Sequence, residues 1–246
     1  MIWIRSIAFT IAFYLYSTIV ALLMVPLFAC PRAWTTRALT LHGKGVVFLL
    51  RWLANIRFEV RGLENLPRGA ALVAGKHHAF FDIFGSFTVM PDACFVLKKE
   101  LAWVPFVGWY ATKADMIVVD RSAHSTALRK LVRDAKDRFS NARQLVIFPE
   151  GTRKAPGDEP DYKPGIAALY RELEMPVIPL ALNTGCHWPA HGFKRYPGTI
   201  IFEFLPAIPA GLKRGEFMRE LESRIETASN ALLAEERQGP DSRRLN

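Results

Sequence analysis

The N-terminal part of the sequence contains a long stretch without any charged residue. Ile7 to Cys30 spans 24 residues, none of which is Asp, Glu, Lys or Arg, and as an α-helix it would be about 36 Å long. The stretch is longer than the apolar part of a typical signal peptide, and no small-residue cleavage site follows it. Because Arg32, Arg37 and Lys44 come soon afterwards, the positive-inside rule would place the rest of the chain in the cytoplasm. We therefore expect attachment to the cell (inner) membrane, with the remainder of the chain on the cytoplasmic side.

A second apolar stretch, Gly45–Ile56, is interrupted by Arg51 and is too short to cross a bilayer. It is typical of an interfacial or buried helix. One spanning helix and a two-helix insertion into one leaflet both remain possible, as does packing of both segments onto a soluble core. We expect three parts: membrane-anchoring helices over 1–56, a catalytic domain over 57–236 and a flexible tail over 237–246.

Charge and composition narrow the classes of partner. The net charge is +9, from 32 Lys and Arg against 23 Asp and Glu, which suits an anionic membrane or a phosphorylated substrate as well as nucleic acid. No basic-aromatic recognition module is present, so we expect no nucleic-acid partner. The three cysteines Cys30, Cys94 and Cys186 are scattered and form no CxxC pair, which argues against disulfides and a structural zinc site.

After the N-terminal stretch, short apolar runs alternate with helical patterns. The runs expected to be strands are Arg57–Arg61, Ala71–Ala74, Cys94–Leu97, Met116–Val119, Leu145–Phe148, Val177–Leu182 and Thr199–Phe204. The segments expected to be helices are Phe81–Met90, Ser125–Phe139, Pro164–Leu173 and Glu216–Glu236. The alternation predicts an α/β fold, a mixed and largely parallel sheet flanked by helices.

One histidine is placed to act as a base. His77 and Asp82 follow the predicted strand Ala71–Ala74. On a single helix, residues five apart point about 140° away from each other and cannot meet. If His77 lies in a turn and Asp82 in the first turn of a helix, their side chains can meet, and an imidazole so held is suited to accept a proton. The alternative is a histidine that merely caps a helix.

Arginine occurs at the ends of two other predicted strands. Phe148-Pro149-Glu150-Gly151-Thr152-Arg153 follows one strand, and Asp120-Arg121 follows another. Gly151 lets the backbone approach an anion, and Arg153 can hold a phosphate through two hydrogen bonds. Because ligands collect at the carboxyl ends of parallel strands, the pattern favours a base beside a phosphate site, although each arginine alone could be a surface ion-pair partner. The motifs GxSxG, GxxxxGK[ST], GxGxxG and HExxH are absent.

At these residues the sequence resembles the glycerolipid acyltransferases of the 1-acyl-glycerol-3-phosphate acyltransferase type, the HX4D family. The resemblance covers about half of the chain, and four blocks occur in the family's order. The blocks are His77 with Asp82, Gly108 to Arg121, Phe148 to Arg153, and Val177-Ile178-Pro179.

The resemblance implies transfer of a fatty acyl group from acyl-CoA or acyl carrier protein to the free hydroxyl of 1-acyl-glycerol-3-phosphate (lysophosphatidic acid), giving phosphatidic acid. By resemblance, Asp82 orients His77 and His77 removes the hydroxyl proton, without a covalent intermediate, cofactor or metal. The residues implied to bind the substrate phosphate are Arg121, Glu150, Gly151, Thr152 and Arg153. Those implied to lie along the acyl chain, with membrane lipids nearby, are Val177, Ile178 and Pro179.

The sequence departs from the family at two positions. The family commonly has Asn before the histidine and Ser two residues after it, where this chain has Lys76 and Ala79. The departures leave open another lysolipid acceptor, such as lyso-ornithine lipid. A non-catalytic, membrane-anchored lipid-binding protein is the alternative from a different class.

Overall fold

A computed structural model describes residues 1–120, 122 and 124–238. In this part of the chain, seven strands form one sheet. The strands are β1 (Ile56–Arg61), β2 (Ala71–Gly75), β3 (Ala93–Lys98), β4 (Ile117–Val119), β5 (Gln144–Ile147), β6 (Val177–Leu182) and β7 (Gly198–Phe204). The central strands β2, β5 and β6 are buried along their whole length, as expected for strands covered on both faces.

The strand order brings several strand ends to one edge of the sheet. The order is β1-β7-β6-β2-β5-β3-β4. The neighbouring strands from β6 to β4 are all paired in parallel, whereas β7 runs antiparallel to β6. The carboxyl ends of β2, β4, β5 and β6 therefore lie at the same edge, where ligands bind in sheets of this kind.

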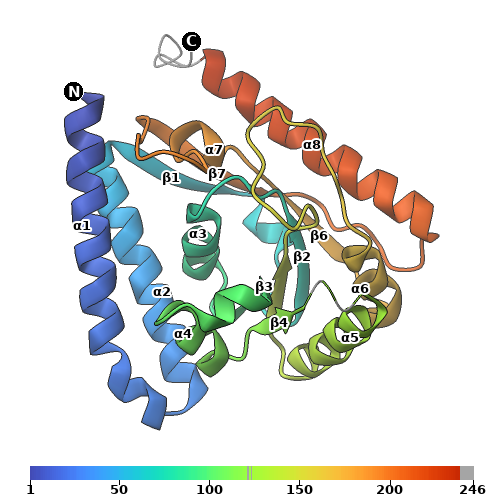
Figure 1. Ribbon diagram of the computed structural model, residues 1–246. Helices are drawn as coiled ribbons and strands as arrows, with labels where there is room; N and C mark the ends of the chain where they lie inside the picture. Colours follow the sequence, from blue (N-terminus) through green and yellow to red (C-terminus); the bar gives the residue numbers. More distant parts are fainter. Residues whose placement is uncertain (121, 123, 239–246) are drawn as a thin grey trace.

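Helices lie on both sides of the sheet. On one side α3 is nearest to the sheet, with α2 and α1 beyond it, and α5, α6 and α8 are on the other side (Figure 1). The α-helices are α1 (Ile2–Leu23), α2 (Arg32–Leu49), α3 (Phe81–Val89), α4 (Val107–Lys113), α5 (His124–Ser140), α6 (Gly165–Leu173), α7 (Thr184–His187) and α8 (Arg214–Gln238). Short 3₁₀ segments are η1 (Val25–Ala29), η3 (Leu63–Asn65) and η4 (Lys99–Trp103), and η2 (Leu50–Ala54) is a π-helical turn that ends α2.

The expected fold class, a mixed and largely parallel α/β sheet behind an apolar N-terminal helix, is confirmed. Helices α2, α4 and α7 differ from the expectation, and α7, which is one turn long, was not expected. The second helix begins at Arg32 rather than near Gly45, because it is held by packing on α3 rather than by its own apolar pattern. At Gly43 a Cβ would lie 2.7 Å from the Phe84 carbonyl oxygen, so only glycine permits this approach of α2 to α3. The short helix α4 was not expected, and it follows Phe106 at φ +63°, a conformation that no sequence pattern announces.

The predicted division into 1–56, 57–236 and 237–246 stays a prediction. Helix α8 extends to Gln238, and residues 239–246 lie outside the described part of the chain.

Helix α1 is docked onto the rest of the chain along one face. Phe9 and Phe13 are buried and meet the Trp188 ring edge to face, at centroid distances of 5.3 and 5.5 Å. Ser6 Oγ accepts a hydrogen bond from the backbone N–H of Arg195 at 2.8 Å. The other faces of α1 expose large apolar side chains, including Ile4, Ile11, Leu15 and Leu23.

Among the described residues, one helical segment, Ile2–Ala29, is long and apolar enough to cross a membrane, judged by length and composition alone. Such a helix is consistent with membrane association.

Docking of α1 predicts different effects for its two faces. Phe9→Ala should lower the free energy of unfolding by about 3–5 kcal/mol, because it leaves a cavity against Trp188. Ile4→Ala, on the exposed face at 74% exposure, should change it by less than about 0.5 kcal/mol. Denaturant unfolding in detergent micelles measures both values. Equal effects of the two substitutions would mean that α1 does not pack on the domain.

Candidate active site

The β2–α3 connection carries His77 and Asp82. His77 lies in the loop after β2, and Asp82 lies in the first turn of α3. The His77 Nδ1 and Asp82 Oδ2 atoms are 2.7 Å apart. A carboxylate can only accept hydrogen bonds, so Nδ1 carries the proton in this contact. In the neutral imidazole, Nε2 then holds the lone pair that can accept a proton from a substrate.

Backbone groups of the loop between β2 and α3 hold the Asp82 carboxylate in place. Its side chain is fully buried, and Oδ2 also accepts hydrogen bonds from the backbone N–H groups of His78 and Ala79, each at 2.8 Å. Three donors on one oxygen hold both the carboxylate and the loop in one position. The imidazole orientation is therefore set before a substrate arrives.

The second histidine of the pair differs in its surroundings. The His78 side chain is buried, at 1% exposure, and burial lowers the pKa of His78 to about 4, although Asp82 opposes this shift. His77 is more accessible, with 17% of its side chain exposed. Of the two rings, His77 is the one that a substrate hydroxyl can approach.

The loop after β5 packs against His77. The Phe148 ring stacks on the His77 ring, with centroids 4.1 Å apart and planes 13° from parallel. The backbone N–H of Lys154 donates to the His77 carbonyl oxygen at 2.9 Å. The proposed base and the Phe148–Arg153 segment are thus in direct contact, although they lie about 70 residues apart in the sequence.

Gly151, Thr152 and Arg153 form the outer part of this loop. Gly151 has φ +67°, which favours glycine, and its N–H closes a turn onto the Phe148 carbonyl at 2.9 Å. Thr152 and Arg153 are exposed. The Arg153 guanidinium donates one long hydrogen bond, to the Ala190 carbonyl at 3.5 Å, which leaves donors that can reach an anion.

Glu150 points inward from the same loop. Its side chain is 1% exposed, and its Oε1 atom lies 2.9 Å from Lys76 Nζ. Burial raises the pKa of Glu150, whereas the Lys76 ammonium acts to lower it. The structure therefore places Glu150 beside a buried cation, while Gly151, Thr152 and Arg153 lie on the outside of the turn.

The remaining predicted residues lie elsewhere. Arg121 lies outside the described residues. Its neighbour Asp120 bonds Lys99 Nζ at 2.8 Å. Val177, Ile178 and Pro179 are buried within β6, where Ile178 and Pro179 are paired with Val73 and Ala74 of β2. Their predicted contact with an acyl chain stays a prediction.

Sequence reasoning missed two parts of this arrangement. Lys76 stood out only as a departure from the family pattern, although a lysine directly after a buried apolar strand is a usable signal. Glu226 of α8, which also bonds Lys76, carried no signal, because it lies 150 residues away on an amphipathic helix.

Comparison with known proteins identifies the family. The sequence profile of the Acyltransferase family matches residues 57–183. A 1-acyl-sn-glycerol-3-phosphate acyltransferase of Pseudomonas aeruginosa is 35% identical over 189 residues, covering 77% of this chain and 74% of that protein. The protein of the same name from Limnanthes alba is 30% identical over 171 residues, covering 68% of this chain and 60% of that protein.

The fold also matches a solved structure, that of the 1-acyl-sn-glycerophosphate (LPA) acyltransferase PlsC from Thermotoga maritima. The TM-score is 0.79, at 21% identity, over 95% of this chain and 98% of the other. The four sequence blocks, the matched profile and the relatives lead to one conclusion: the chain belongs to the acyltransferase family of enzymes.

Proposed function

We propose that this chain transfers a fatty acyl group from an acyl thioester to the free hydroxyl of 1-acyl-glycerol-3-phosphate, which gives phosphatidic acid. The observation that carries the proposal is the His77–Asp82 contact of 2.7 Å at the carboxyl end of β2. Membership of the family supports acyl transfer as the reaction. The names of the relatives, which are 1-acyl-sn-glycerol-3-phosphate acyltransferases, support 1-acyl-glycerol-3-phosphate as the acceptor. The donor is acyl-CoA or acyl carrier protein.

His77 and Asp82 divide the proton chemistry between them. His77 Nε2 takes the proton from the acceptor hydroxyl while the hydroxyl oxygen attacks the carbonyl carbon of the thioester. When the tetrahedral intermediate collapses, the carbon–sulfur bond breaks and the thiolate takes the proton from His77. Asp82 keeps Nδ1 as the donor and stabilises the imidazolium that exists between the two steps.

The loop after β5 would hold the acceptor phosphate. Arg153 is exposed beside the loop that stacks on His77, and its fork of N–H donors matches phosphate oxygens. The exposed Thr152 hydroxyl and the Gly151 turn lie next to it. Arg121, which follows β4 in the sequence, is proposed to contribute as well. Fixing the phosphate there positions the hydroxyl for His77.

An apolar surface would place this site at the membrane. Exposed aromatic and aliphatic side chains occur on α1, on α2 with η2, and on η4 with α4. They include Ile4, Ile11, Leu15, Trp34, Leu41, Phe48, Trp52, Trp103 and Trp109. Because α1 is docked onto the domain, insertion of α1 would bring the domain to the bilayer surface. We propose the cytoplasmic face of the cell membrane, as the positive residues after α1 favour.

His77→Ala should lower kcat by about 10²–10⁴-fold, since general-base catalysis typically contributes that much. Asp82→Asn should also be severe, because it removes the charge that fixes the Nδ1 proton. His191→Ala, which changes an exposed histidine, is the control. Initial rates of thioester consumption measure the effect, with circular dichroism to check folding. If His77→Ala were active and His78→Ala inactive, the base would be His78, and the assignment to His77 would be wrong.

Arg153→Ala should remove about 2–4 kcal/mol of transition-state stabilisation with lysophosphatidic acid, because a charged contact to phosphate is lost. With monoacylglycerol, which lacks the phosphate, the same substitution should have little further effect. The measurement is kcat/KM for both acceptors. Arg171→Ala, an exposed arginine of α6 paired with Glu172, is the matched control. A similar loss with both acceptors would remove Arg153 from the phosphate site.

Membrane attachment is expected to survive high salt and to be lost in detergent, because it rests on apolar rather than charged contacts. Fractionation of cell membranes before and after each wash measures it. Release of the protein by salt alone would show that the attachment is electrostatic and would contradict insertion of α1.

A further inference from the structure

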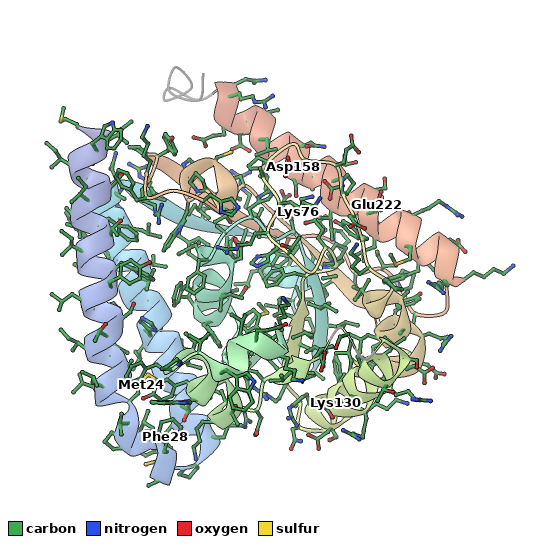
Figure 2. The ribbon with its side chains drawn as sticks, viewed as in Figure 1. Met24, Phe28, Lys76, Lys130, Asp158 and Glu222 are labelled. Atoms are coloured by element: carbon green, nitrogen blue, oxygen red, sulfur yellow. The ribbon has the colours of Figure 1, made fainter. Side chains whose placement is uncertain are left out.

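A largely buried cluster of polar side chains is centred on Lys76, the residue before His77 in the sequence. The Lys76 side chain is only 3% exposed. Its Nζ atom lies 2.9 Å from Glu150 Oε1 and 2.8 Å from Glu226 Oε1. The Tyr162 hydroxyl donates to the same Glu226 oxygen at 3.0 Å. We call these four residues the Lys76 cluster, and Figure 2 shows Lys76 beside α8, near the labelled Asp158 and Glu222.

The cluster joins three segments that are remote in sequence. Lys76 belongs to the loop that carries His77, Glu150 to the loop that carries Arg153, and Glu226 to α8. Burial, with the nearby Glu226 carboxylate, raises the pKa of Tyr162 far above its ordinary value, so its hydroxyl stays a neutral donor to Glu226. One ammonium therefore connects both active-site loops to the C-terminal helix.

Buried apolar side chains, among them Leu221 and Ile225, hold α8 to the core. Between α8 and the 157–160 loop, however, lies a cavity of about 490 Å³ that Glu226 lines, so the loop is not packed against α8 there. Buried ion pairs add little net stability, because desolvation of the charges offsets their attraction, but they demand one geometry. Such a cluster suits the positioning of loops better than it suits general stabilisation.

We propose that Lys76 and Glu226 are positioning residues for acyl transfer, which fix the His77 loop and the Arg153 loop relative to each other through Glu150. This inference rests on the proposed function. It makes α8 part of the active-site framework, although α8 supplies no group to the reaction. It also gives a role to the lysine that replaces the family's usual asparagine.

The test compares kcat and KM for the purified full-length enzyme with lysophosphatidic acid and an acyl thioester. The variants are Glu226→Gln, Lys76→Met, the double substitution and Lys76→Arg, which keeps the charge. The control is Glu235→Gln. It makes the same change on the same helix and breaks the contact of Glu235 with Arg61 of β1. In the sheet, β1 lies three strand spacings, about 14 Å, from β2, so this contact is remote from the His77 loop. Thermal unfolding checks that each variant is folded.

We expect Glu226→Gln to lower kcat by about 10- to 100-fold in folded enzyme, since a displacement of about 1 Å can cost about 100-fold. Lys76→Arg should retain more activity than Lys76→Met. The double variant should lose no more than the worse single variant, because the residues act as a unit. Glu235→Gln should keep the wild-type kcat.

Glu226→Gln is the decisive variant if Lys76→Met, which leaves the buried Glu150 and the partly buried Glu226 carboxylates without their cation, does not fold. An unchanged kcat for Glu226→Gln, with only the thermal midpoint lowered, would overturn the inference and leave a structural role. Equal losses of kcat for Glu226→Gln and Glu235→Gln would also overturn it. In that case any weakening of the contacts of α8 would lower the activity, and Glu226 would have no specific role. A wild-type enzyme without acyl transfer would instead overturn the proposed function.

Discussion

The hydrogen bonds to the buried Asp82 carboxylate determine the geometry of the whole site. One oxygen, Oδ2, accepts from His77 Nδ1 and from two backbone N–H groups of the loop. A buried carboxylate is costly unless it is hydrogen-bonded. These three bonds offset part of that cost, since Oδ1 is buried without a hydrogen-bond partner among the described residues. They also fix the loop, the start of α3 and the imidazole together. Without the carboxylate, nothing described in the loop would hold the His77 ring in this orientation except its stack on Phe148.

The sheet brings the second half of the site to this point. Because β2 and β5 are parallel neighbours, their following loops leave the same edge and touch through the Phe148 ring and the bond from Lys154 to His77. Behind them, Lys76 connects Glu150 to α8. His77 and Arg153 therefore sit on loops that contact each other and that Lys76 and Glu150 connect to α8, which limits the motion of the two residues relative to one another.

The local parts of the structure could be predicted from the sequence. The strand Val177–Leu182 has the expected bounds, because a strand buried on both faces leaves an uninterrupted apolar run. The contact of His77 with Asp82 follows from a turn before a helix start. The long-range parts could not be predicted. The Lys76–Glu226 pair depends on where α8 crosses the sheet, α2 depends on its packing against α3, and Phe106 has a positive φ without any glycine to signal it.

In the proposed reaction, an acceptor hydroxyl activated by His77 attacks the thioester directly. The most direct measurement is the release of free thiol from an acyl thioester by the purified enzyme, with and without lysophosphatidic acid. If the attack is direct, thiol is released only when the acceptor is present, with one phosphatidic acid formed for each thiol. A burst of about one thiol per enzyme in the absence of acceptor would reveal a covalent acyl-enzyme and would rule out direct attack.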